Sequence, residues 1–394
     1  MTSEWRTIRA ADFIDFNPRL SLKKGDIATK VAMDKLKPFT KKIPETEKAE
    51  FNGGAKFCNG DTVMARITPC LENGKTAYVD MLDDGEIGFG STEFIVMRAK
   101  TEISDPQFVY YTAINPVFRN VAIKSMVGSS GRQRVQQSVL EELELSVPDL
   151  DEQRRIGDFL ARIDEKIALN DRINDNLEQQ AQSYFQELFV DNADPEWAIG
   201  TISDLGTVVG GSTPSKAKPE YYTESGIAWI TPKDLSINKS KFVSHGENDI
   251  TELGLKNSSA AIMPEGTVLF SSRAPIGYIA IAAGEVTTNQ GFKSVVPKPE
   301  IGTPFVYFFL KNTLPVIEGM ASGSTFKEVS GSTMKNVPAV IPDAETLAKF
   351  SDFCAPIFAQ QRILEEQNQS LATLRDNLLP KLMSGEIDVS TVQL

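Results

Sequence analysis

One short loop in the first half of the chain combines residues that could contact a nucleic acid. Residues 128–134 read Gly-Ser-Ser-Gly-Arg-Gln-Arg, which places arginines at Arg132 and Arg134. The glycines allow flexibility, and hydroxyl and guanidinium groups suit a phosphate or the edge of a guanine. Residues 323–327, Gly-Ser-Thr-Phe-Lys, form a similar run in the second half and end at Lys327. Each run lies between a predicted domain helix and a strand that leads into a long helix, so we expect both to be surface loops at equivalent places.

Other polar residues have the same character. The turn-rich run 210–216, Gly-Gly-Ser-Thr-Pro-Ser-Lys, suits a surface loop that offers amides and hydroxyls, and nine lysines lie between residues 23 and 56. Acidic residues are interspersed among these lysines, so a solvated face is an equally good interpretation. The candidate DNA contacts are therefore Arg66, Arg132, Arg134, Thr213, Ser215, Lys216, Lys233, Arg273 and Lys327.

The sequence lacks the usual catalytic signatures. His245 is the only histidine, which excludes any site that needs two. The run at 73–76 ends like a phosphate-binding loop, but Pro69 stands where the first glycine is required. The sequence has no Asn-Pro-Pro-Tyr or Asp-Pro-Pro-Tyr element, with which amino-methyltransferases hold a flipped base. We expect no catalytic residues, no metal and no cofactor, and no binding of S-adenosylmethionine by the isolated chain.

The elements that position these residues occur twice, about 194 residues apart. Phe-Val-Tyr-Tyr at 108–111 returns as Phe-Val-Tyr-Phe at 305–308, and Val-Pro-Asp at 147–149 returns as Ile-Pro-Asp at 341–343. Glu4-Trp5 returns as Glu196-Trp197. A period of half the chain is too long for a solenoid and indicates two domain-sized units. Such a duplication suggests a pseudo-symmetric molecule that engages a two-part target.

A long helix is predicted after each unit. Apolar or seam positions recur there at alternating spacings of four and three residues, which is typical of a coiled coil. They are Ile156, Leu160, Ile163, Ile167, Asn170, Asn174, Leu177, Ala181, Tyr184 and Leu188, and then Phe350, Cys354, Ile357, Gln361, Leu364, Asn368, Leu371, Arg375, Leu378 and Leu382. The alternative is that each helix packs on its own domain. A helix of about 39 residues is roughly 58 Å long, longer than such a domain is wide, which favours pairing of the two helices.

The direction of the helices follows from the linker between the first helix and the second unit. About seven residues reach at most about 25 Å, so the second unit must follow the far end of the first helix, and the second helix must run back. We expect an antiparallel pair with a globular unit at each end, related by a pseudo-twofold axis. Asp158, Glu165, Asp171 and Glu178 should lie on the exposed face of the first helix, and Pro356 should kink the second.

The predicted fold class is mixed α/β (α+β), with two globular domains joined by the antiparallel coiled coil. Strands are expected at 62–68, 76–80 and 93–97 and again at 267–271, 278–282 and 292–296, and helices at 106–123 and 304–317, both bent by a proline. The predicted boundaries are 1–148 for the first domain, 149–194 for the first long helix, 195–342 for the second domain, 343–388 for the second long helix and 389–394 for a tail.

The distribution of charge keeps nucleic acid possible despite a net charge of −12. Segments 149–195 and 343–394 carry −7 and −4, so the globular parts are nearly neutral and can present a basic face. The three cysteines, Cys58, Cys70 and Cys354, fit reduced cytosolic thiols. The N-terminal residues do not resemble a signal peptide, and the longest apolar stretch is too short for a membrane span. We expect a cytoplasmic protein without a membrane partner.

With its repeat and its helices, the chain resembles the specificity (S) subunit of a type I restriction-modification enzyme over essentially its whole length. The residues that carry the resemblance are Gly211-Ser212-Thr213-Pro214-Ser215, Tyr221-Tyr222, Trp229-Ile230-Thr231-Pro232-Lys233-Asp234, Thr288-Asn289-Gln290-Gly291-Phe292, Pro148, Glu152-Gln153, Ile156 and the run from Leu378 to Ile387. The first unit departs from this pattern, because it lacks the Gly-Thr-Pro run and has Asn17-Pro18-Arg19 near that place.

The resemblance implies a subunit without catalytic activity that reads a bipartite double-stranded DNA site, one half per target-recognition domain. It also implies that the helices hold two methyltransferase subunits, which bind S-adenosylmethionine and modify adenine, and that motor-nuclease subunits join the complex for cleavage. Two alternatives stay open: the specificity partner of a fused restriction-methylation enzyme, and a scaffold that binds proteins rather than DNA. Salt-dependent, sequence-selective duplex binding would exclude the scaffold.

Overall fold

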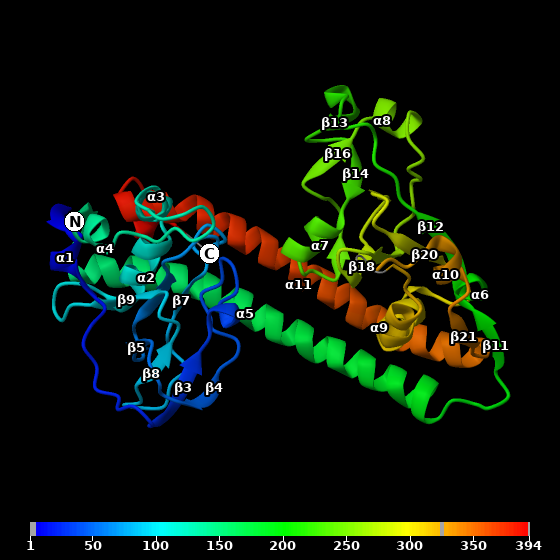
Figure 1. Ribbon diagram of the computed structural model, residues 1–394, viewed down its shortest axis with the longest axis horizontal. Coiled ribbons are helices and arrows are strands. Elements are labelled where there is room, and N and C mark those ends of the chain that lie inside the picture. Colours follow the sequence, from blue (N-terminus) through cyan, green and yellow to red (C-terminus); the bar gives the residue numbers. More distant parts are fainter. Residues whose placement is uncertain (1–4, 324–326, 393–394) are drawn as a thin grey trace. The chain divides into compact units, whose positions relative to one another are not determined.

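The computed structural model describes residues 5–323 and 327–392, which form two compact units. Unit 1 comprises the chain up to Leu169 together with the part from Gln367 onward, and unit 2 comprises Asn170–Glu366. Each unit therefore contains a globular part and a portion of both long helices (Figure 1). Glu4 of the sequence repeat, residues 324–326 of the second predicted loop and the last two residues of the tail lie outside the described residues.

Unit 1 contains two four-stranded sheets and a separate two-stranded ladder. The strands of the first sheet, in spatial order and all antiparallel, are β2 (Ile14–Phe16), β9 (Phe94–Ala99), β6 (Thr62–Ala65) and β7 (Thr76–Tyr78). The second has the order β4 (Glu47–Glu50), β3 (Ile27–Val31), β8 (Gly88–Gly90) and β5 (Ala55–Phe57), with β3 and β8 parallel. The ladder pairs β1 (Arg6–Arg9) with β10 (Glu144–Val147). The helices are α1 (Ala10–Phe13), η1 (Met33–Lys35), α2 (Pro106–Ile114), α3 (Pro116–Lys124), α4 (Gln137–Glu141) and η4 (Val389–Thr391).

Unit 2 contains a five-stranded sheet, a four-stranded sheet and a ladder. The first has the order β12 (Gly206–Gly210), β20 (Lys293–Pro297), β17 (Val268–Ser272), β18 (Ile276–Ala282) and β15 (Phe242–Val243). The second has the order β13 (Tyr222–Thr223), β16 (Asn248–Ile250), β14 (Ile227–Ile230) and β19 (Thr287–Thr288). The ladder pairs β11 (Ala198–Thr201) with β21 (Pro338–Ile341). The helices are α6 (Ile202–Leu205), η3 (Pro219–Tyr221), α7 (Pro232–Ile237), α8 (Glu252–Lys256), α9 (Thr303–Gly319) and α10 (Gly331–Lys335).

The two units repeat one topology. The order β2-β9-β6-β7 returns as β12-β20-β17-β18, the parallel pair β3-β8 returns as β14-β19, and the ladder β1-β10 returns as β11-β21. The predicted mixed α/β fold and the predicted duplication are therefore confirmed. The predicted strands lie within a few residues of β6, β7, β9, β17, β18 and β20.

The two prolines that were expected to bend the domain helices act differently. Asn115 leaves the helical conformation, and its side chain accepts a hydrogen bond from the amide of Val117, so it caps a new helix that begins at Pro116. The predicted single helix over 106–123 is therefore wrong: the segment forms α2 and α3, and Pro116 takes a place in the first turn of α3, where a proline is well tolerated. In unit 2, α9 continues through Pro315 as one helix.

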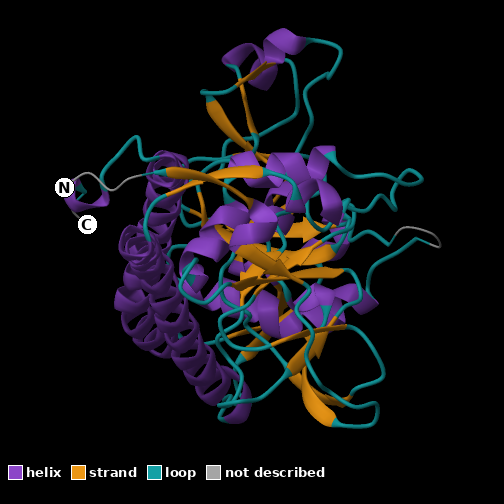
Figure 2. Ribbon diagram, turned by 90° about the vertical axis from the view of Figure 1, so that its left-hand side faces the viewer, coloured by secondary structure: helices purple, strands orange, loops and turns teal. Residues whose placement is uncertain are grey.

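The long helices are α5 (Leu150–Gln186), which ends in a π-helical turn, η2 (Glu187–Asp191), and α11 (Ala344–Ser384). Every predicted seam position is buried or half-buried. In unit 1, Asp164 pairs with Arg375, and the carbonyl of Ile167 accepts a hydrogen bond from Asn368, so the chains run in opposite directions. In unit 2, Gln361 donates to the carbonyl of Asn174, while Tyr184 contacts Phe350 and Phe353. The antiparallel pairing is confirmed within each unit, and Figure 2 shows the helices side by side.

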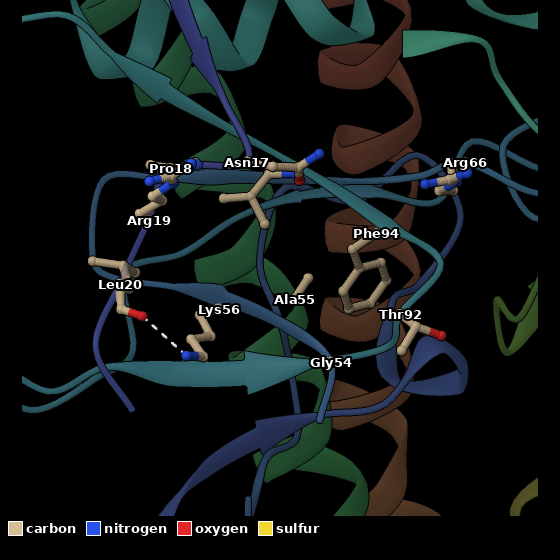
Figure 3. A pocket seen from close by; sticks show the side chains of 11 residues that line it. Asn17, Pro18, Arg19, Leu20, Gly54, Ala55, Lys56, Arg66, Thr92 and Phe94 are labelled. Atoms are coloured by element: carbon tan, nitrogen blue, oxygen red, sulfur yellow. Dashed lines mark hydrogen bonds between the residues drawn. The ribbon is translucent and has the colours of Figure 1, made fainter. Parts of the chain in front are cut away.

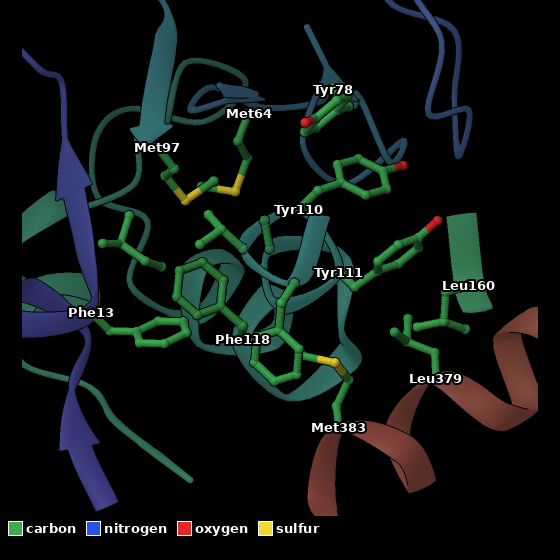
Figure 4. Close-up of a cluster of buried hydrophobic side chains, with 14 of the residues drawn as sticks. Phe13, Met64, Tyr78, Met97, Tyr110, Tyr111, Phe118, Leu160, Leu379 and Met383 are labelled. Carbon is green, nitrogen blue, oxygen red and sulfur yellow. The ribbon is translucent and has the colours of Figure 1, made fainter. Parts of the chain in front are cut away.

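The helices also pack on the globular part of their own unit, so both packings that the sequence allowed occur together. In unit 1, Leu160 and Leu379 join a core that contains Tyr110, Tyr111 and Phe118 (Figure 4). In unit 2, Ala181, Phe185, Phe350 and Cys354 share a core with the aromatic residues of α9. Burial of these side chains fastens each globular part to a stretch of both helices.

Candidate nucleic-acid interface

The two arginine- and lysine-containing loops are attached at equivalent places. An antiparallel bridge joins Val127 to Arg134 in unit 1, and another joins Ser322 to Glu328 in unit 2. The residue after each bridge is hydrogen-bonded to the end of β6 in unit 1 or of β17 in unit 2. The amide of Val135 donates to the carbonyl of Arg66 at 2.8 Å, and the amide of Val329 donates to the carbonyl of Ser272 at 3.0 Å. The first loop and the described residues of the second therefore occupy the same position in the repeated fold.

The first loop brings two of the candidate arginines to one carboxylate. Arg134 donates to Glu93 through Nε at 2.9 and 3.0 Å and through Nη2 at 2.6 Å, and the Nε atom of Arg66 lies 3.7 Å from the same carboxylate. The hydrogen bonds from Arg134 hold the pKa of Glu93 below its ordinary value. Arg132 is exposed and forms no ion pair within the described ranges. Of the three arginines, Arg132 is therefore the most available to an incoming anion.

A basic hollow of about 600 Å³ lies beside Arg66. It is lined by Asn17, Arg19, Lys56 and Thr92 among other residues, and Figure 3 shows Lys56 reaching the carbonyl of Leu20. Lys56 donates to Leu20 and Leu22 at 3.0 and 3.1 Å, which ties down the segment that carries Arg19. Asn17 has a positive φ of 50°, and its side chain accepts from the amide of Val96 at 2.9 Å. Arg19 is not among the candidate contacts predicted from the sequence, although Asn17-Pro18-Arg19 stands there in place of the glycine-rich run, and Lys56 is considered only as one of the nine lysines between residues 23 and 56.

In unit 2 a polar network joins three of the segments that carry candidate contacts. Thr213 donates to the side chain of Gln290, and the main-chain carbonyl of Gln290 accepts from the ammonium of Lys293 at 3.3 Å. Lys293 also lies 3.8 Å from Glu328, and Arg273 lies 3.4 Å from that carboxylate. Burial lowers the pKa of Lys293. Gln290 belongs to the Thr-Asn-Gln-Gly-Phe run, so that run and the glycine-rich loop meet here.

The other candidates of unit 2 lie on neighbouring segments. Lys233, on α7, is exposed and pairs with Glu247 at 2.6 Å. Ser215, Lys216 and Lys327 are exposed, and neither lysine forms an ion pair in the part of the chain that the structure describes. The glycine-rich loop itself is fixed, because the indole of Trp229 donates to the carbonyl of Ser212 at 3.0 Å and Tyr222 donates to that of Pro214 at 2.6 Å.

The lysine-rich segment 23–56 is not a free basic face. Lys30, Lys35, Lys42 and Lys48 each pair with a carboxylate. Lys41 is only 5% exposed; its ammonium lies 4.9 Å from the centroid of the Tyr111 ring and donates to the hydroxyl of Tyr111 at 3.2 Å. Burial lowers the pKa of Lys41 to about 8. This lysine connects the globular part of unit 1 to the helices, because Tyr111 donates to Asp164 of α5 at 2.6 Å.

Unit 2 has an equivalent buried lysine, Lys241, at 7% exposure. The main-chain carbonyls of Lys41 and Lys241 accept from the amides of Tyr78 and Ile281, which lie on the equivalent strands β7 and β18. Lys241 donates to Glu178 of α5 at 2.8 Å and to Gln361 of α11 at 2.9 Å. The prediction that Glu178 lies on the exposed face is therefore wrong. Although burial opposes it, the nearby Lys241 and Lys311 lower the pKa of Glu178.

Two further findings concern the described residues alone. Within 5–323 and 327–392, no group of three or more histidine, cysteine, aspartate or glutamate side chains is arranged to hold a metal ion. In the same ranges no helix combines the length and the apolar character that crossing a membrane requires.

The comparison with protein families decides the interpretation of this arrangement. A family model described as the type I restriction modification DNA specificity domain matches residues 3–179 and again residues 195–374. The chain belongs to this family. Because the model matches twice, each copy of the internal repeat corresponds to one such specificity domain.

Similar proteins agree with this assignment. The type I restriction enzyme MjaIX specificity subunit of Methanocaldococcus jannaschii is 39% identical over 194 residues, which are 47% of this chain and 45% of that protein. The HindI specificity subunit of Haemophilus influenzae is 24% identical over 407 residues, and the aligned region spans 83% of this chain and 86% of that protein. The chain thus spans about half of the first relative and most of the second.

A solved structure supports the fold. The crystal structure of a type I restriction-modification system S subunit from M. genitalium matches over 96% of both chains with a TM-score of 0.58 at 18% identity. The predicted resemblance is confirmed, and so is the prediction that the chain is a specificity subunit of a type I restriction-modification system rather than an enzyme.

Proposed function

We propose that this specificity subunit reads a bipartite double-stranded DNA site, one half with each unit, in the cytoplasm. The observation that carries the proposal is that the two units share one topology but have different side chains at equivalent positions. At the end of the loop, the bridged residue is Arg134 in unit 1 and Glu328 in unit 2. The residue whose main-chain carbonyl accepts a hydrogen bond from the following amide is Arg66 in unit 1 and Ser272 in unit 2. A constant frame with changed contact residues is what two different short sequences require.

The contacts with DNA are proposed to come from the loops and strand ends of each unit. In unit 1 they are Arg66, Arg132 and Arg134, and in unit 2 they are Thr213, Ser215, Lys216, Lys233, Arg273 and Lys327. Arg132 is the best candidate for reading a guanine, since its guanidinium is exposed and forms no ion pair among the described residues. Arg134, Arg273 and Lys233 are held by carboxylates, so they would contribute to DNA binding only by exchanging those partners.

The long helices are proposed to hold two methyltransferase subunits and to set the spacing between the half-sites. α5 is continuous over 37 residues, which corresponds to about 56 Å. Asp158, Glu165 and Asp171 are exposed on it and offer an acidic surface. Motor-nuclease subunits would join through the assembled complex. The domain boundaries given above, at 148, 194, 342 and 388, belong to the same proposal.

A duplex selection experiment tests the proposal. The purified chain, together with the methyltransferase subunits encoded beside it, would be used to select from random duplex DNA at several salt concentrations. The expected result is two short fixed segments separated by a constant unread spacer, with affinity that falls as salt rises. Enrichment of one continuous site would contradict the bipartite proposal, and absence of any selective binding would favour the protein scaffold. A partner gene that fuses nuclease and methyltransferase would identify the fused architecture.

A further inference from the structure

The ladders β1-β10 and β11-β21 differ sharply in polarity at their second pair of facing residues, called here the second rung. In unit 1 this rung pairs Thr7 with Ser146, and both side chains are exposed. In unit 2 the same rung pairs Ile199, which is 84% exposed, with Val340, which is 39% exposed. The two ladders have the same register, so unit 1 shows that this rung does not need apolar residues to form. The isoleucine and valine therefore need another explanation.

Ile199 and Val340 belong to an apolar hollow of about 360 Å³. Alternation along the two strands puts Trp197, Ile199, Pro338, Val340 and Pro342 on one face of the ladder, and all five line the hollow. The other walls include Phe185, Phe189, Val190, Phe305 and Phe309, from the end of α5, η2 and α9. The indole of Trp197 donates to Asp343 at 3.0 Å, which fixes one wall. All of these residues lie within unit 2.

Two of the segments that line the hollow are acidic, while a third, α9, carries Lys311, which pairs with Glu178. Residues 187–204 and 338–348 contain seven aspartates and glutamates and no lysine or arginine. Glu187, Glu196 and Glu345 are exposed, and none forms an ion pair among the described residues. In unit 1, by contrast, β1 carries Arg6 and Arg9 where β11 has Ala198 and Thr201. On the facing strand, β10 carries Glu144 where β21 has Pro338. The strand β11 of the second ladder thus has no basic residue beside the apolar pair Ile199 and Val340.

We infer that this hollow is the docking site for a segment of a partner protein that presents apolar side chains flanked by lysine or arginine. Apolar side chains bury against Ile199 and Val340, and basic flanks face the exposed carboxylates of Glu187, Glu196 and Glu345 in the neighbouring segments. DNA is excluded as the occupant, because its phosphates would face these carboxylates. A second copy of this chain is disfavoured, since an isologous contact would bring two sets of these carboxylates together. If the proposed function holds, the partner is a methyltransferase subunit.

The test uses the full chain and a synthetic amphipathic helical peptide with one leucine- and phenylalanine-rich face and lysines at both ends. A matched peptide carries glutamates at its ends. The probe variant combines Ile199→Thr with Val340→Ser, which installs the residues of unit 1 in unit 2. Ile27→Thr is the control, since Ile27 is a strand residue of unit 1 and is 69% exposed. Thermal melting of each variant verifies the fold.

The expected result is saturable binding of the lysine-flanked peptide, weakened by salt and weakened about tenfold or more in the double variant, while the control binds like wild type. Equal binding of the glutamate-flanked peptide, or unchanged binding by a folded double variant, would overturn the inference, as would failure of the wild type to bind.

A second arm measures assembly with the methyltransferase subunit by native mass spectrometry. If the folded double variant retains wild-type assembly with it, the methyltransferase is not the occupant and the partner assignment fails. If the wild type does not assemble with it at all, the proposed function fails, and the peptide arm still decides whether the hollow binds a basic, apolar segment.

Discussion

Glu93 accepts three hydrogen bonds from the guanidinium of Arg134 and lies 3.7 Å from the Nε atom of Arg66. Two of the three candidate reading arginines of unit 1 are thus held by a carboxylate of the protein itself. If unit 1 binds DNA through these arginines, as proposed, DNA must compete with Glu93 for them, and Glu93 would then weaken the attraction of unit 1 for phosphates.

Glu93→Gln should strengthen non-specific duplex binding, because it removes one negative charge beside two arginines. We expect the salt dependence of binding to steepen by up to about one phosphate contact. Fluorescence anisotropy with unrelated duplexes at several salt concentrations measures this. Weaker binding that is confined to the cognate duplex would show instead that Glu93 itself contacts a base.

Arg132→Ala should weaken binding to the cognate site by about 1–3 kcal/mol if its guanidinium reads a guanine, and should relax selection at that base. Arg154→Ala is a suitable control, since Arg154 is an exposed arginine on α5 that is paired with Asp151. Competition binding with duplexes substituted at each position measures the effect. Equal weakening on all sequences would make Arg132 a phosphate contact, and unchanged binding would remove it from the interface.

Removing one partner of the buried ion pair between Asp164 and Arg375 should strongly destabilise unit 1. Asp164→Ala leaves the buried Arg375 with only the largely exposed carboxylate of Asp376, 2.8 Å away, and should lower the free energy of unfolding by about 3 kcal/mol. Replacing both Asp164 and Arg375 with leucine should lower it less, because no buried guanidinium is left and Asp376, which also loses a partner, is largely exposed. Urea unfolding measures both, with Asp158→Ala on the exposed face of α5 as control. A double variant as unstable as the single one would contradict the role of the pair.

The two buried lysines predict a rise in stability with pH. Burial lowers the pKa of Lys41 and Lys241 to about 8, from an ordinary value of 10.5. Between pH 8 and 9 the unfolded chain therefore binds more protons than the folded one, and the free energy of unfolding should rise by about 1 kcal/mol per lysine. Above pH 9 Cys354 acts in the opposite sense, because burial raises its pKa to about 12. Denaturant unfolding should show a smaller rise for Lys41→Met, and an unchanged slope would refute the assignment to Lys41.

Periodic features of this chain were predictable from sequence. The duplication and the seam depend on residue spacing, which the sequence displays directly. Glu178 was misassigned because its partners, Lys241 and Lys311, come from distant segments, so helical periodicity alone places it outside. Lys41 was counted in a basic cluster for the same reason: its burial depends on the tyrosines of α2. The hollow around Arg19 forms only when four separate segments meet, so no pattern within one segment of the sequence predicts it.

The most direct test of the central claim is methylation-sensitive sequencing of DNA from cells that carry the complete system with one altered unit at a time. Arg132→Ala alters unit 1, and Arg273→Ala alters unit 2. If each unit reads one half-site, the first variant should relax or lose only one half of the methylated sequence, and the second only the other half. Changes in the same half by both variants, or a methylated sequence that is one continuous block, would contradict the account.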